Sequence, residues 1–314
     1  IEPVYERTDK EYQQIQEAGK AEVGKAVRAI AQAAAAGEEK DTLVVVNTTG
    51  YERDDLVTLP GEKEMVAVYT EDGEKLPVQQ TSDGVVFFAE KIPSTGWKKF
   101  YPVYSGGENA ADAECQADGH GPAAWNGTYE NDFYKVVFND KMQIVSLVEK
   151  EDDREYIKEG GIGNHLCTYE DRPMNWDNWD IDEYYKRKPY EADWVSQPVV
   201  VENGDVETVI QYSMGFGDST VTQKVCLYHD IPRIDFKTTA EWNTHHVILR
   251  VNFPVDVNAN RASFEVQFGN VERETTCNQS WDSAKFEVCG HKWADLSEYS
   301  GGVSLLNDCK YGYG

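Results

Sequence analysis

The sequence has no closely spaced cysteine pair of the CxxC type. This absence argues against a zinc ribbon and against the dense disulfide framework of a small secreted domain, so we expect reduced thiols and a cytoplasmic protein. No run of the given residues is apolar for the length of a membrane span, and none has the pattern of a signal peptide. The six cysteines are Cys115, Cys167, Cys226, Cys277, Cys289 and Cys309.

Basic residues are also scarce, with 30 Lys and Arg against 56 Asp and Glu, which gives a formal net charge of −26. Nucleic acid and anionic membranes would be repelled by such a chain, so we expect neither as a partner. The hydrophobic share of 40% is ordinary for a folded globular protein. The aromatic share of 12% is high, and it fits a neutral partner such as a carbohydrate.

The hydrophobic pattern changes along the chain from a helical period to a strand period. Residues 9–36 carry apolar side chains at spacings of three and four and predict one or two helices. Short alternating segments between residues 43 and 104 predict a small antiparallel β-sandwich. A small, polar stretch at 105–114 is typical of a linker. Strands without intervening helices beyond it predict a large antiparallel β-sandwich, so the fold class is mainly β with an N-terminal helical part.

Residues 173–185 interleave aromatic rings with carboxylates and amides. Aromatic faces pack on the apolar faces of a pyranose, and polar groups bind its hydroxyls, so this segment is a candidate sugar site. The alternative is a surface loop whose tryptophans pack onto the sheet and whose acids are merely solvated. The predicted substrate-binding residues are Trp176, Asp177, Trp179, Asp180 and Tyr184.

Ordered motifs along the whole chain carry a family resemblance. They occur at residues 131–134, 144–147, 154–155, 176–181, 233–236, 253–255, 267–269, 280–282, 290–297 and 305–312. With these motifs the chain resembles the C-terminal part of the glycoside hydrolase family 38 α-mannosidases. The resemblance implies three parts: a helical bundle remnant at 1–38, a small β-sandwich at 39–106, and a large mutarotase-like β-sandwich at 107–314, incomplete at its C-terminal end.

The resemblance also implies a function for the parent protein, which would be a retaining, zinc-dependent hydrolase of terminal α-mannosides. Its nucleophile and zinc ligands would lie on an N-terminal α/β barrel outside this chain. We therefore expect no catalytic residue, no metal and no hydrolysis in the fragment itself. The six histidines show no HxD or HExxH arrangement, which agrees with that expectation. The implied partners are an α-mannoside oligosaccharide, the protein's own catalytic domain and a possible homo-oligomer.

Other interpretations stay open. The segment with His291, Lys292, Trp293 and Asp295 is either a second contact region or a structural turn. His245 and His246 would suit a mutarotase-like enzyme that opens a hexose by general acid–base chemistry, although neighbours on a strand point to opposite faces. The third alternative is a stand-alone, noncatalytic carbohydrate-binding module.

Overall fold

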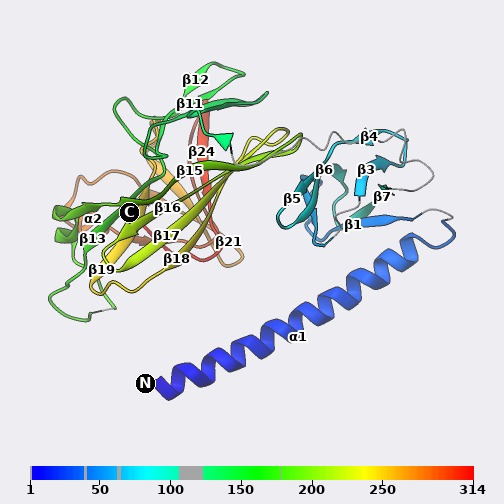
Figure 1. The fold of residues 1–314 in the computed structure, drawn as a ribbon. Helices are drawn as coiled ribbons and strands as arrows, with labels where there is room; N and C mark the ends of the chain where they lie inside the picture. Colours follow the sequence, from blue (N-terminus) through cyan, green and yellow to red (C-terminus); the bar gives the residue numbers. More distant parts are fainter. Residues whose placement is uncertain (1, 39–40, 62–64, 106–122, 178) are drawn as a thin grey trace. The chain divides into compact units, whose positions relative to one another are not determined.

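A computed structural model describes residues 2–38, 41–61, 65–105, 123–177 and 179–314 (Figure 1). The protein is mainly β, with one long N-terminal helix and several antiparallel sheets, as the sequence predicts. It divides into two compact units, of which the first holds the described parts of residues 1–121 together with 202–208 and 228–231. The predicted boundary between residues 106 and 107 lies outside the described residues, so the three-part division stays a prediction.

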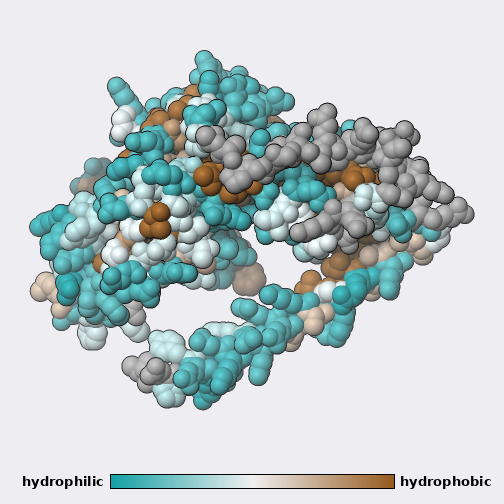
Figure 2. All heavy atoms as spheres, viewed as in Figure 1, coloured by the Kyte–Doolittle hydropathy of each residue, from teal (hydrophilic) through white to brown (hydrophobic). Residues whose placement is uncertain are grey.

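Helix α1 runs from Glu2 to Ala34 as one continuous element, starting earlier than the predicted residue 9. Its composition of Ala, Glu, Gln and Lys explains the helix, since these residues have high helix propensity. Several large side chains on it are more than half exposed, including Tyr5, Tyr12 and Ile15. Figure 2 shows mostly hydrophilic residues on its visible face. Among the described residues, no helix combines the length and apolar character needed to cross a membrane.

The strands of the first unit form two antiparallel sheets around an apolar core. One sheet has the order β1 (Leu43–Asn47), β7 (Gly96–Tyr104), β3 (Met65–Thr70) and β4 (Lys75–Leu76). The other has the order β2 (Arg53–Leu59), β6 (Gly84–Ile92) and β5 (Val78–Thr81). Met65, Val68, Val85, Phe87 and Phe100 are fully buried in the core. This arrangement confirms the small sandwich that the alternating pattern predicts.

Gln79 on β5 holds the 202–208 segment of this unit. Its Oε1 accepts hydrogen bonds from the backbone N–H groups of Val206 (3.0 Å) and Glu207 (2.8 Å), and its Nε2 donates to Glu207 O (2.9 Å). Gln79 is only 4% exposed. At Gly204 a Cβ would lie 2.5 Å from Gln79 Cδ, so only glycine allows this approach.

We expect Gln79→Ala to destabilise this unit by about 2–4 kcal/mol, because two buried N–H groups would lose their acceptor. Chemical unfolding and amide exchange at Val206 and Glu207 measure the loss. The matched control is Gln80→Ala, since Gln80 is exposed and donates a single hydrogen bond, to Met65 O. Equal losses for the two variants would contradict this role of Gln79.

The second unit contains the large antiparallel sheets. The five-stranded sheet has the order β18 (Ile234–Glu241), β17 (Ser219–Tyr228), β16 (Glu207–Phe216), β15 (Asp193–Asn203) and β8 (Ala123–Ala124). A four-stranded sheet has the order β12 (Arg154–Glu155), β11 (Ile144–Glu149), β10 (Tyr134–Phe138) and β9 (Thr128–Glu130). Val136, Ile144, Ile210, Tyr212 and Val225 form the centre of its core.

The remaining strands complete this unit. One sheet consists of β14 (Pro189–Glu191), β13 (His165–Glu170) and β19 (Val247–Asn252). Another consists of β21 (Gly269–Glu274), β20 (Arg261–Val266), β23 (Trp293–Glu298) and β24 (Gly301–Leu306), and a short pair joins β22 (Val288–Cys289) to β25 (Gly312–Tyr313). A single-turn helix, α2 (Ser280–Ser283), precedes β22. The sheet with β13 at its centre positions the candidate site.

Candidate functional site

The pairing of β13 with β19 brings two connecting segments together. Its register places Glu170 opposite Val247, the last residue of one strand against the first of the other. The next residues outward, Asp171 and His246, therefore also meet, and Asp171 N donates a hydrogen bond to His246 O (2.8 Å). Asp171 begins the segment that carries the predicted sugar-binding residues, and His246 ends the β18–β19 connection (Figure 1). The site thus joins residues 75 positions apart.

A pocket of about 310 Å³ opens at this junction. Asp177 from the first segment faces His246 from the second, with 3.6 Å between Asp177 Oδ2 and His246 Nδ1. Trp242 adds a partly exposed indole ring to the wall. The complete lining is Asp171, Asp177, Trp242, Thr244, His245, His246 and Val247. Two carboxylates, imidazoles and an aromatic face are the groups that bind polyhydroxylated ligands.

The backbone is strained on both sides of the pocket. His246 has φ +55° and Trp176 has φ +63°, a region that residues with a Cβ adopt at a cost of about 1–3 kcal/mol. The strain at Trp176 accompanies a tight turn, in which Trp179 N and Asp180 N both donate to Trp176 O. These conformations turn the chain sharply at His246, a partner in the Asp177–His246 contact, and at Trp176, the residue before Asp177.

The environment of the pocket raises the pKa of Asp171. Burial and, after it, repulsion from Asp177 raise the pKa of Asp171 above its usual value, while His246 opposes the shift. The pocket thus holds two acids of unequal environment, because Asp177 is the more exposed of the two. Its groups can accept hydrogen bonds from hydroxyls, and an Asp171 carboxyl that retains its proton can also donate one.

We expect Asp177→Asn to lower the pKa of Asp171 toward its usual value, because the substitution removes the repelling charge and keeps the side-chain shape. The shift should be partial, since burial of Asp171 remains. A ¹³C NMR titration of the aspartate carboxyl groups measures it. Asp180→Asn is the matched control, as Asp180 lies on the same segment but outside the pocket lining. An unchanged Asp171 titration in Asp177→Asn would contradict the assigned cause.

The other predicted sugar-binding residues lie outside the pocket lining. Trp176 is 74% exposed and Trp179 is 90% exposed, so neither packs onto the sheet as the alternative interpretation required. Tyr184 donates to Asp182 Oδ2 (2.7 Å), which also accepts from Met174 N (2.7 Å). These two hydrogen bonds hold the pKa of Asp182 below its usual value. The Tyr184 hydroxyl therefore binds a side chain of its own segment. The substrate-binding role of these residues stays a prediction.

Tyr185 anchors the end of the segment in the 3₁₀ turn Glu183–Arg187. It is 4% exposed and packs edge-on against Tyr169, with ring centroids 5.3 Å apart. Its hydroxyl donates to Glu287 Oε1 (3.2 Å), a carboxylate that also pairs with Arg250. Arg250 lies beside the Tyr185 ring as well, 5.6 Å from its centroid. This cluster fixes the C-terminal end of the predicted sugar-binding segment.

The second predicted contact region belongs to a sheet. Trp293 and Asp295 lie on β23, and Asp295 accepts hydrogen bonds from Ser297 and Ser304. Lys292 N donates to Glu265, and the His291 ring contacts Gln267 at 3.1 Å. These contacts favour the structural interpretation of this region.

The pocket does not fit zinc. Within the part of the chain that the structure describes, one group of three His, Cys, Asp or Glu side chains has ligand atoms close enough for a single metal, and none of its members lines the pocket. Asp171 and Trp242, in contrast, belong to the pocket although no sequence motif indicated them. The signal available for Asp171 was its position two residues before the aromatic segment 173–185, and for Trp242 its place three residues before His245.

Comparisons with known proteins agree on one family. The sequence pattern described as "Glycosyl hydrolases family 38 C-terminal domain" matches residues 129–314. Alpha-mannosidase G of Dictyostelium discoideum is 33% identical over 287 residues, which cover 88% of this chain and 26% of that protein. Human alpha-mannosidase 2C1 is 38% identical over 190 residues, 59% of this chain and 18% of that protein. The chain therefore spans about a quarter or less of the length of these relatives.

A solved structure shares the fold. The crystal structure of an alpha-mannosidase from Enterococcus faecalis V583 matches 93% of this chain and 40% of its own chain with a TM-score of 0.64. Its sequence identity is 12%, so this similarity concerns the fold alone.

Proposed function

The chain belongs to glycosyl hydrolase family 38, and on that premise we propose that it is the C-terminal β-region of an α-mannosidase. In this role it supports the N-terminal catalytic barrel and lines the edge of the pocket that binds a terminal α-mannoside. The relatives named above support the proposal, since those proteins are alpha-mannosidases. The parent reaction would be retaining and zinc-dependent, with the reacting carboxylates and the zinc ligands outside this chain.

One observation carries the assignment of the pocket edge. Asp177, a residue of the predicted sugar-binding segment, contacts His246 in a pocket walled by Trp242. A carboxylate can accept hydrogen bonds from two neighbouring hydroxyls of a sugar, and the indole face can pack on the C–H groups. Trp176 and Trp179 are exposed and would supply further aromatic surface for the same ligand. These residues would bind and orient substrate and would take no part in bond cleavage.

Hydrolysis of an aryl α-mannoside tests the proposal. The 314-residue chain and a protein extended N-terminally through the barrel are assayed side by side, each with zinc and with a chelator. We expect hydrolysis by the extended, metal-loaded protein alone. Hydrolysis by the 314-residue chain itself, unaffected by the chelator, would contradict the proposal and place a complete active site in this chain.

A second candidate function has support from the same pocket. His246 beside Asp177 is the kind of pair that opens a hexose ring by general acid–base catalysis. Polarimetry of freshly dissolved hexoses separates it from the first, because only this alternative expects the 314-residue chain to accelerate mutarotation. His246→Asn should then abolish the acceleration. An unchanged mutarotation rate with the unaltered chain would remove this candidate.

A further inference from the structure

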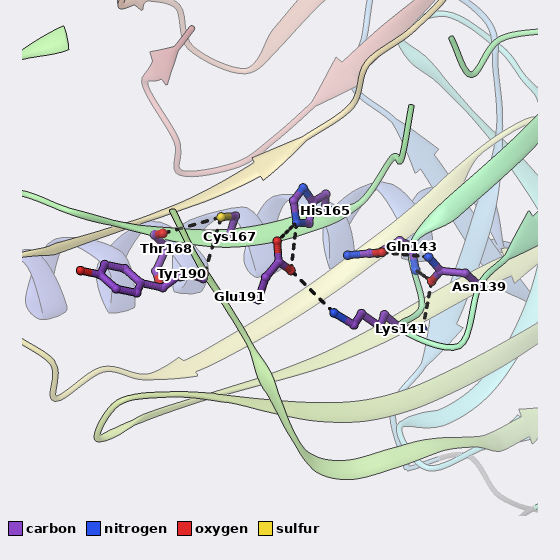
Figure 3. A network of polar contacts seen from close by, with 8 residues as sticks. All are labelled: Asn139, Lys141, Gln143, His165, Cys167, Thr168, Tyr190 and Glu191. Atoms are coloured by element: carbon purple, nitrogen blue, oxygen red, sulfur yellow. Dashed lines mark hydrogen bonds and ion pairs between the residues drawn. The ribbon is translucent and has the colours of Figure 1, made fainter. Parts of the chain in front are cut away.

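Strands β13 and β14 place three metal-ligand side chains on one sheet face. His165 and Cys167 are two residues apart on β13, so their side chains point to the same side. The register pairs Cys167 with Glu191 on β14, which puts Glu191 beside them on that face. Figure 3 shows His165 facing Glu191, with Cys167 next to them and its sulfur directed toward Thr168 and Tyr190. We call His165, Cys167 and Glu191 the β13–β14 cluster. The candidate pocket described above contains none of them.

The distances are close to those of a metal site. His165 Nε2 lies 3.0 Å from Glu191 Oε1 and 3.2 Å from Oε2. One ligand atom from each residue, with Cys167 Sγ as the third, lies within 4.8 Å of the other two. Tetrahedral zinc with bonds of about 2.0–2.3 Å separates its ligands by roughly 3–4 Å. A shift of about 1 Å in side-chain positions would therefore complete the geometry.

We propose that His165, Cys167 and Glu191 bind a zinc ion, with water in the fourth position. Imidazole and thiolate ligands favour zinc over magnesium or calcium, which prefer sets made of oxygen atoms. Binding converts the Cys167 thiol to a thiolate and releases its proton to solvent. The thiol would leave its present contacts with the backbone oxygens of Thr168 and Tyr190, each at 3.6 Å. The proposal does not depend on the α-mannosidase assignment.

Access to the cluster is possible from one side. Cys167 is 1% exposed, but the Glu191 side chain is 53% exposed and the His165 side chain 17%. An ion can thus reach Glu191 and His165 first and meet the thiol at the inner end. The cluster was missed in the sequence analysis because the His165–Cys167 spacing is visible there but the strand partner Glu191 is not.

The ammonium group of Lys141 lies near Glu191 and should weaken metal binding. Lys141 Nζ lies 4.0 Å from Glu191 Oε2, on the hairpin turn between β10 and β11. That turn is held by Asn139, whose Oδ1 accepts from Lys141 N and whose Nδ2 donates to Gln143 (Figure 3). Lys141 competes for the Glu191 carboxylate and repels a dication. Removing its charge should therefore strengthen metal binding, the opposite of removing a ligand.

Cobalt titration of the 314-residue chain tests the proposal, because a Co²⁺–thiolate bond gives a charge-transfer band in the near ultraviolet. We expect this band to saturate at one ion per chain and zinc to remove it. Cys167→Ser should abolish the band, Glu191→Gln should weaken binding at least tenfold, and Lys141→Met should tighten it severalfold. Cys277→Ser, which changes an exposed thiol, should leave it unaltered.

Circular dichroism of each variant controls for folding, and Glu191→Gln changes an exposed side chain in case Cys167→Ser does not fold. Absence of the band in the unaltered chain would overturn the proposal. So would a full band in folded Cys167→Ser, since the exposed cysteines would then be the ligands. Unchanged affinity in Glu191→Gln would likewise remove Glu191 from the site and the proposal with it.

Discussion

Asp177→Asn in the whole enzyme should lower kcat/KM for an α-mannoside by about 10- to 100-fold. The substitution keeps the shape of the side chain and removes its charge, and a hydrogen bond to a charged group contributes about 1.5–3 kcal/mol. The Asp177 side chain is 61% exposed, so the free energy of unfolding should change by less than about 0.5 kcal/mol. Steady-state kinetics with an aryl α-mannoside, together with thermal unfolding, measure both quantities.

Two matched variants control for the loss of an acidic side chain outside the pocket lining. Asp180→Asn changes an acid on the same segment that does not line the pocket, and we expect a smaller effect on kcat/KM. Asp152→Asn changes an acid in the turn after β11 and should have none. Equal kinetics for the unaltered enzyme and Asp177→Asn would remove Asp177 from the substrate pocket.

Tyr185→Ala should have the largest effect on stability, a loss of about 3–5 kcal/mol in the free energy of unfolding. The variant removes a buried ring that contacts Tyr169 and Arg250 and leaves a cavity behind it. Tyr185→Phe keeps the ring and loses only the hydrogen bond to Glu287, so its cost should be about 1–2 kcal/mol. Denaturant unfolding compares the two. Equal losses would show that the hydroxyl, and not the packed ring, anchors the segment.

The same residue gives a pH dependence. Burial, opposed by Arg250 and assisted by Glu287, raises the pKa of Tyr185 from 10.0 to about 12. A group whose folded pKa is raised contributes its full stability below the unfolded pKa and loses it as the pH rises through the folded value. The stability contribution of Tyr185 should therefore fall between pH 10 and 12. Tyr185→Phe should remove that part of the pH dependence, and identical pH curves for both proteins would contradict it.

The fold class could be predicted from the sequence because strands and helices leave local hydrophobic patterns. Alternation at period two identified strands such as β10, β16 and β17, and the Ala-rich period near 3.6 identified α1. Strands β13 and β15 were not predicted. Both mix polar and aromatic residues with apolar ones, so their alternation is weak. The ordered motifs identified the family, and the matching family pattern over residues 129–314 confirms it.

Only part of the candidate site could be predicted from the sequence, because the contacts between its residues depend on strand register. The sequence suggested Asp177 and, separately, His246 as members of competing interpretations. Their contact follows from the pairing of Glu170 with Val247, which no local pattern encodes. The metal-ligand cluster has the same origin, since the Cys167–Glu191 pairing joins β13 to β14 across the aromatic segment. Local composition therefore indicated the residue types, and tertiary pairing decided which of them meet.

Photolabelling of the whole enzyme tests the central claim most directly. A non-hydrolysable α-mannoside with a diazirine on its aglycone would be bound, irradiated and mapped by mass spectrometry. If the segment after β13 lines the edge of the substrate pocket, the label should appear on peptides that contain residues 171–185 or 242–247, and free mannoside should compete it away. Competed labelling confined to the catalytic barrel would contradict the account.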